Sequence, residues 1–141
     1  MSPSNLIDAR GPRFAATISA LVMAVVILTQ SAWLLLAQAF IFALGAKFGP
    51  TKSPYGQAYR KLVKPRLAPP TKFENIEPPR FAQLVGTIFA VIGLLGSALG
   101  VQPVFLGAAG AAFAAAFLNS AFGYCLGCET YLLLKRFTPV Q

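Results

Sequence analysis

Two long apolar tracts constrain this chain more than any other feature. They run over residues 14–46 and 81–118, and a polar, proline-rich segment separates them. A helix needs roughly 20 apolar residues to cross the hydrocarbon core of a bilayer, so each tract exceeds one span. Because 56% of the residues are hydrophobic and the mean hydropathy is +0.64, we expect lipid rather than water to surround the fold.

Each tract divides at its most turn-like residues. In the first tract, the triplet Thr29-Gln30-Ser31 is the most polar point and predicts a break. In the second, the break falls at Gly100-Val101-Gln102-Pro103, because glycine favours helix ends and proline the first helical turn. The predicted helices cover about 12–28, 31–48, 80–99, and from about 103 past the C-terminal Cys-x-x-Cys motif.

The basic residues orient these helices. All twelve lie before the first helix, between the second and third helices, or near the C-terminus, and neither hairpin turn carries one. Since short loops rich in Lys and Arg stay cytoplasmic, four spans place both termini and the loop 49–79 in the cytoplasm. The prediction is an all-α, multi-pass protein of the bacterial cytoplasmic membrane, with one four-helix domain over residues 1–141. The net charge of +8 is then explained by anionic lipid headgroups, without a nucleic-acid partner.

A short internal repeat links the two hairpins. The residues Pro12-Arg13-Phe14-Ala15 recur as Pro79-Arg80-Phe81-Ala82, and Phe48-Gly49 recurs as Phe122-Gly123. These motifs lie at the start and near the end of each pair of helices, which predicts a duplicated hairpin in parallel orientation.

Small residues on the last two helices predict close packing, because they let helix backbones approach each other in lipid. A contact face for a second copy of the chain is the alternative use, so a homo-oligomer remains open. These residues are Gly86, Gly93, Gly96, Gly100, Gly107, Ala108, Ala111, Ala112, Ala115 and Ala116.

The middle segment is too polar to cross a membrane. Ser53-Pro54, followed by Tyr55, Tyr59 and Leu62 at near-helical spacing, predicts a short amphipathic helix at the membrane interface. The rest of the segment, residues 65–79, is rich in proline and is predicted to be extended.

One cluster in the chain carries reactive chemistry. Both cysteines, Cys125 and Cys128, are spaced as Cys-x-x-Cys, and Glu129 follows. Two such sulfurs can form a disulfide, bind a metal or exchange with another thiol. The chain contains no histidine, which excludes Ser-His-Asp triads and Cys-His pairs. Two thiolates and Glu129 supply at most three of the four ligands of a structural zinc site, so we expect neither a metal nor another cofactor.

The predicted topology places the cysteines at the cytoplasmic interface, where a stable disulfide is disfavoured. We therefore expect a dithiol that exchanges electrons or sulfur with another molecule, with Glu129 as a candidate proton acceptor. Nearby positive charge from Lys135, Arg136 or Arg80 would favour the thiolate. Packing-only cysteines in a structural or transport subunit are the alternative, although transporters usually need an ionisable residue inside a span.

Several motifs resemble a bacterial family of small integral membrane proteins known only as a domain of unknown function. The resemblance covers nearly the whole chain and implies four spans with a C-terminal Cys-x-x-Cys. It also implies a soluble thioredoxin-like or sulfurtransferase partner, but no established activity or enzyme class. The motifs are Gly11-Pro12-Arg13-Phe14-Ala15, Gly49-Pro50, Ser53-Pro54-Tyr55-Gly56, Pro78-Pro79-Arg80-Phe81-Ala82-Gln83, Asn119, and the run from Phe122 to Glu129.

A more distant likeness is to quinone-coupled thiol oxidoreductases of the vitamin K epoxide reductase type. These are four-span bundles with a Cys-x-x-Cys on the last helix. They hold their cysteines toward the oxidising side, whereas the charges of this chain place Cys125 and Cys128 on the reducing side. The chain also has no second cysteine pair to relay electrons. Quinone-coupled thiol oxidation is thus an alternative function that rests on this likeness alone.

Overall fold

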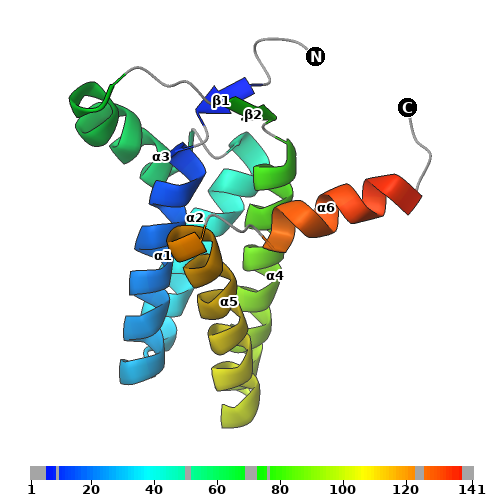
Figure 1. Cartoon of the computed structure of the whole chain (residues 1–141). Helices are drawn as coiled ribbons and strands as arrows, with labels where there is room; N and C mark the ends of the chain where they lie inside the picture. Colours follow the sequence, from blue (N-terminus) through cyan, green and yellow to red (C-terminus); the bar gives the residue numbers. More distant parts are fainter. Residues whose placement is uncertain are drawn as a thin grey trace.

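The computed structural model describes residues 6–8, 10–49, 52–68, 73–75, 77–122 and 126–137. Four long helices pack side by side, and a further helix projects sideways from them in the upper half of the view (Figure 1). The main helices are α1 (Arg10–Thr29), α2 (Ala32–Phe48), α4 (Glu77–Ala98), α5 (Gln102–Phe122) and α6 (Leu126–Phe137). A short helix, α3 (Pro54–Ala58), continues as a π-helical turn, Tyr59–Val63, and a 3-10 turn, Lys64–Arg66.

The first three predicted helices are present as α1, α2 and α4, with ends within a few residues of the expected positions. The last one differs. Where the sequence predicts one helix running past the Cys-x-x-Cys, the structure has α5 ending at Phe122 and a separate α6 beginning at Leu126. Gly123 follows Phe122 in the sequence, and glycine is the residue most often found just beyond a helix end.

The two hairpin turns lie together at one end of the four helices. Gln30 has a left-handed backbone conformation, with φ of 54°, and the hydroxyl of Ser31 accepts a hydrogen bond from the amide of Leu34 at the start of α2. The side-chain amide of Gln102 donates a hydrogen bond to that of Gln30 across the two turns. The predicted break at residues 29–31 is therefore confirmed.

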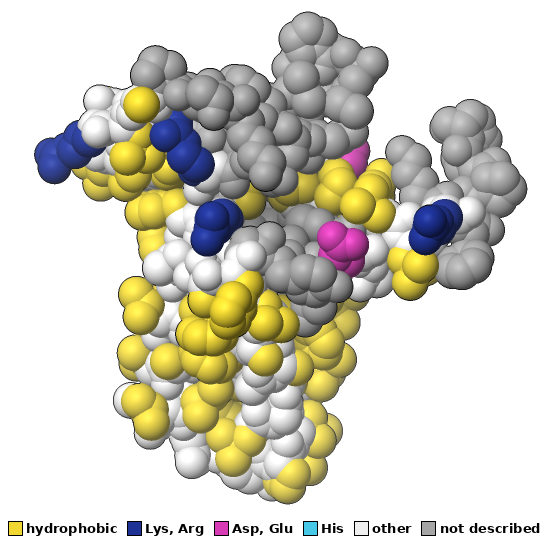
Figure 2. Space-filling view, viewed as in Figure 1, with side chains coloured by type: hydrophobic (Ala, Val, Ile, Leu, Met, Phe, Trp, Pro, Cys, Tyr) yellow, Lys and Arg dark blue, Asp and Glu magenta, His cyan; other side chains and the backbone are white. Residues whose placement is uncertain are grey.

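The lateral surface of the helices is apolar. Figure 2 shows Lys and Arg side chains only in the upper part of this face, while the lower part shows hydrophobic side chains and backbone with no charged side chain. Leu28 and Trp33, for example, are 83% and 82% exposed. By length and composition, α1, α4 and α5 can each cross a membrane, and α2 is a shorter apolar helix of 17 residues.

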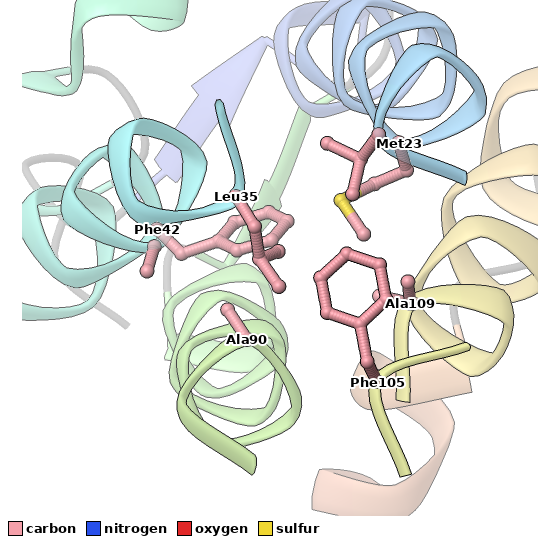
Figure 3. Close-up of a cluster of buried hydrophobic side chains, with 9 residues drawn as sticks. Met23, Leu35, Phe42, Ala90, Phe105 and Ala109 are labelled. Carbon is pink, nitrogen blue, oxygen red and sulfur yellow. The ribbon is translucent and has the colours of Figure 1, made fainter. Parts of the chain in front are cut away.

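The interior holds a small apolar core. Met23 of α1, Leu35 and Phe42 of α2, and Phe105 of α5 are buried against one another (Figure 3). Alanines complete the cluster, and helices approach where side chains are small. A Cβ atom on Gly96 of α4 would lie 2.8 Å from Val104 and 3.0 Å from the backbone nitrogen of Phe105.

Not every small residue that the sequence predicts for packing serves this purpose. Gly100 has a φ of 76°, and no atom lies within 4 Å of the position that a Cβ would occupy there, so it forms the turn between α4 and α5. Gly107 also has open space around it. Of Gly96 and Gly100, only Gly96 allows a close approach between helices, because α4 ends before Gly100.

The sequence repeat corresponds to a repeat of structure. Two short strands, β1 (Leu6–Asp8) and β2 (Phe73–Asn75), lie just before α1 and α4 and pair antiparallel. When the sequences are aligned so that Pro12 matches Pro79, β1 matches β2 residue for residue. In this alignment Ile7 corresponds to Glu74, and these two residues pair with each other. This register is what a twofold axis between the hairpins produces. The strands were not expected from the sequence, which predicts an all-α fold and an unpaired extended segment.

The repeated arginines make equivalent contacts at the ends of helices. Arg13 of α1 donates a hydrogen bond to the carbonyl oxygen of Ser120, near the end of α5. Arg80 of α4 donates to the carbonyl oxygens of Ala46 and Lys47, near the end of α2. Each hairpin therefore caps the second helix of the other hairpin, where the last carbonyls lack partners within their own helix.

The repeated phenylalanines also have equivalent partners. Phe14 lies against Tyr59, with ring centroids 5.6 Å apart and an interplanar angle of 48°. Phe81 lies against Tyr131 of α6, at 5.7 Å and 51°. The helical segment that follows each hairpin thus folds back onto the first helix of a hairpin through one tyrosine, which makes α6 the counterpart of the segment 54–63.

The tyrosines of the middle segment face the helices rather than lipid. Tyr59 is buried, whereas Leu62 is 64% exposed. The hydroxyl of Tyr55 donates a hydrogen bond of 2.6 Å to the buried amide oxygen of Gln38, whose nitrogen donates to Ser19. Burial raises the pKa of Tyr55 above its usual value. Two of the three residues that predict a membrane-facing surface therefore anchor the segment to the helices.

Candidate functional site

The predicted thiol site lies at the start of α6. Cys128 belongs to the first turn of this helix, and Cys125 lies outside the described residues. Glu129, the predicted proton acceptor, is exposed. α6 packs mainly on α4 and projects outward from the bundle, in the half of the molecule away from the hairpin turns (Figure 1). The structure thus places Cys128 and Glu129 on one short helix at the end where the basic side chains gather.

Two arginines near the starts of α1 and α4 have defined partners at this end of the bundle. Arg80 contacts the end of α2 and forms an ion pair of 3.7 Å with Glu77. Arg13 instead contacts Ser120, close to the end of α5. Arg13 is not among the positive charges that the sequence analysis places near the cysteines, which are Lys135, Arg136 and Arg80. The internal repeat contained the signal, since Arg13 and Arg80 occupy equivalent positions.

A cavity of about 430 Å³ lies beside this segment, between α1, α4 and α5. Its walls are mostly alanine, valine, proline and phenylalanine, and none of its lining residues carries a charge. Thr130, one residue beyond Glu129, brings α6 to the cavity. The lining residues are Pro12, Ala16, Ser19, Phe42, Pro79, Ala82, Gln83, Val85, Gly86, Phe89, Ala111, Ala112, Ala115, Ala116, Asn119 and Thr130.

Two carboxamides in the cavity wall are available for hydrogen bonding. A carboxamide side chain on a membrane helix usually hydrogen-bonds to a neighbouring helix. In the part of the chain that the structure describes, neither the side-chain amide of Gln83 nor that of Asn119 has such a partner. Both are partly buried, and a polar group in apolar surroundings is costly unless it is hydrogen-bonded. These amides therefore give the apolar cavity a polar end.

The described residues offer no clustered metal donors. Within the ranges given above, no three side chains of His, Cys, Asp or Glu come together to hold an ion. Of the predicted thiol site, the described residues give the position of Cys128 on α6 and an exposed carboxylate beside it, that of Glu129.

The paired arginine contacts make a matched prediction. We expect Arg13→Met to speed amide hydrogen exchange in the last turn of α5, and Arg80→Met to do so in the last turn of α2. Arg13→Met removes one hydrogen bond to a terminal carbonyl and Arg80→Met removes two. At about 1 kcal/mol for each bond, exchange should rise about fivefold in the first variant and about thirtyfold in the second. Mass spectrometry of deuterated peptides measures both effects. Equal exchange at both helix ends in each variant would contradict the cross-capping.

Comparison with known proteins places the chain in a family. No curated protein and no solved structure matches it. One family, described as a domain of unknown function (DUF4395), matches residues 7–136 and so includes both repeats and the Cys-x-x-Cys. On that match, the chain belongs to the DUF4395 family.

Proposed function

We propose that the chain is a bacterial inner-membrane protein of four spans whose Cys125 and Cys128 form a thiol-redox or sulfur-transfer pair at the cytoplasmic face. The observation that carries the proposal is the position of α6. This helix holds Cys128 at the same end as the basic side chains (Figure 2). Lys and Arg mark the cytoplasmic side of a membrane protein. The pair would then face soluble partners in the cytosol.

The four-span topology rests on the arrangement of the helices. Three of them have the length and composition of a span, and α2, with 17 residues, lies at the lower limit for one. α2 packs along α4 over most of its length, and the hydrogen bond between Gln30 and Gln102 holds both turns at the same level. In this orientation the uncharged turns face the outside, and both termini face the cytoplasm.

The chemistry is an exchange between the dithiol and a soluble partner of thioredoxin-like or sulfurtransferase type. In the redox form, one thiolate attacks the disulfide of the partner, and the second thiolate displaces the partner's sulfur. The membrane pair loses two electrons and two protons as its S–S bond forms, and the partner gains both as a dithiol. In the sulfur-transfer form, a thiolate accepts the terminal sulfur of a persulfide, and the donor leaves as a thiolate.

The test uses the reduced full-length protein in lipid nanodiscs. We expect incubation with an oxidised thioredoxin-fold protein to convert the pair to a disulfide, or incubation with a persulfide donor to add one sulfur atom. Alkylation of the remaining thiols followed by mass spectrometry counts both products. The variant Cys125→Ser with Cys128→Ser is the control. If both thiols of the unmodified chain stay fully alkylatable after both incubations, the proposal fails and the cysteines have a packing role.

A further inference from the structure

The cavity exists because the two repeats differ at the residues that would fill it. Ala46 and Ser120 are equivalent, since the carbonyl oxygen of each accepts a hydrogen bond from the arginine of the other repeat. Counting back along α2 and α5 from this pair, Phe42 corresponds to Ala116, and Gln38 corresponds to Ala112. Phe42 and Gln38 are buried. The second hairpin therefore has two alanines in its cavity wall where the first has two large side chains.

The chemistry of the wall restricts what can fill this space. A volume of about 430 Å³ falls in the range of small-molecule sites, roughly 300 to 1,000 Å³. The lining contains no Lys, Arg, Asp or Glu, so nothing there compensates the cost of burying a charged ligand. Gln83 and Asn119 each offer an N–H donor and a carbonyl acceptor. These amides suit a hydroxyl or carbonyl group, and the alanine and phenylalanine walls suit a hydrocarbon body.

We propose that this cavity binds a neutral lipid-soluble molecule with an apolar chain and a single hydroxyl or carbonyl head. The head hydrogen-bonds to Asn119 and Gln83, and the chain lies along Ala112 and Ala116 toward Phe89. Because Thr130 of α6 lines the cavity, the bound molecule lies next to α6. The inference concerns the cavity alone and does not require the cysteines to react.

The probe is a long-chain fatty alcohol that carries a photoreactive diazirine, used with the full-length protein in nanodiscs. We expect saturable crosslinking to peptides of α4 and α5, and competition by the unlabelled alcohol. The matching diazirine fatty acid, which is charged, should crosslink at least about tenfold less at equal concentration, since tenfold corresponds to only 1.4 kcal/mol. Peptide mass spectrometry identifies the labelled residues.

The repeat supplies the decisive variants. Ala116→Phe places in α5 the residue that fills the equivalent position in α2, and it should reduce saturable crosslinking about tenfold. Ala114→Phe is the matched control, because Ala114 lies on the same helix, is exposed and does not line the cavity. Asn119→Leu keeps the branched shape and the number of side-chain heavy atoms, and it should weaken binding of the alcohol without changing that of the matching diazirine alkane.

Three results would overturn the proposal. Crosslinking that rises with probe concentration without saturating would mean that only bilayer chains enter the cavity. Equal crosslinking of Ala116→Phe and Ala114→Phe would place the probe elsewhere. If Ala116→Phe does not fold, the Asn119→Leu variant decides, because an unchanged preference for the alcohol over the alkane would exclude a role for the polar end.

Discussion

Gly96→Leu is expected to destabilise the fold by about 3 kcal/mol, because overfilling a well-packed contact costs about 1 to 3 kcal/mol and backbone atoms cannot move aside. A Cβ at this position would lie 2.8 Å from Val104 and 3.0 Å from the backbone nitrogen of Phe105. The larger leucine would push α4 and α5 apart next to their turn. The free energy of unfolding, measured by titration with a denaturing detergent in mixed micelles, reports the effect.

Gly107→Leu is the control for this prediction. Gly107 lies on α5, and no atom lies within 4 Å of the place that a Cβ would take there. Leucine at this site should change the free energy of unfolding by no more than about 0.5 kcal/mol, as is usual for surface substitutions. Equal losses at Gly96 and Gly107 would show that the close approach of α4 and α5 does not contribute to stability.

The single-cysteine variants should separate the roles of the two thiols completely. In the sequence, Cys125 immediately precedes the first residue of α6, and Cys128 lies within its first turn. The positive end of a helix dipole lowers thiol pKa values near the N-terminus. We expect Cys125 to attack the partner and Cys128 to resolve the mixed disulfide. Cys128→Ser should therefore accumulate the mixed disulfide, and Cys125→Ser should form none.

Non-reducing gels of the protein in nanodiscs, after incubation with an oxidised thioredoxin-fold protein, measure this trapping. The double variant gives the background. Accumulation in Cys125→Ser but not in Cys128→Ser would reverse the assigned roles while retaining the chemistry. No accumulation in either variant would contradict a thiol-exchange mechanism at this pair.

Hydropathy and turn residues were sufficient to predict α1, α2, α4 and the start of α5, because each predicted break combines a local polar or glycine signal with a span-length apolar run. They did not predict that α6 is a separate helix. The triplet at residues 29–31 and the sequence from Gly100 to Pro103 both form turns, as predicted. The four-residue motif reveals the repeat in the sequence, but it does not predict the contacts that the repeated residues make. Sequence motifs identify Arg13 and Arg80 as equivalent, but only the packing shows that each contacts the opposite hairpin.

Other features depend on tertiary contacts that no local pattern encodes. Tyr55 and Tyr59 have the spacing of a membrane-facing stripe, and they point inward because Gln38 and Phe14 provide partners. The pairing of β1 with β2 requires the two hairpins to be related by a twofold axis. The sequence also does not predict the cavity, since Ala112 and Ala116 resemble ordinary packing residues. Only the comparison of α5 with α2 shows that they stand where α2 has larger side chains.

The two repeats differ where the end opposite the hairpin turns departs from the twofold relation. In the first repeat, the segment after the hairpin is anchored by Tyr55 to the buried Gln38. In the second repeat, the equivalent segment contains the Cys-x-x-Cys. α5 has Ala112 and Ala116 at the positions of Gln38 and Phe42, and both alanines line the cavity. One half of the fold is thus filled and the other contains both the thiols and the cavity.

The most direct test of the account is the side from which the cysteines can be labelled. A membrane-impermeant maleimide is applied to intact bacterial cells and to inverted membrane vesicles, and detergent-solubilised protein shows the full extent of labelling. If both thiols face the cytoplasm, Cys125 and Cys128 should be labelled in inverted vesicles and not in intact cells. Labelling in intact cells alone would contradict it, because the basic end of the molecule and its thiols would then face the outside.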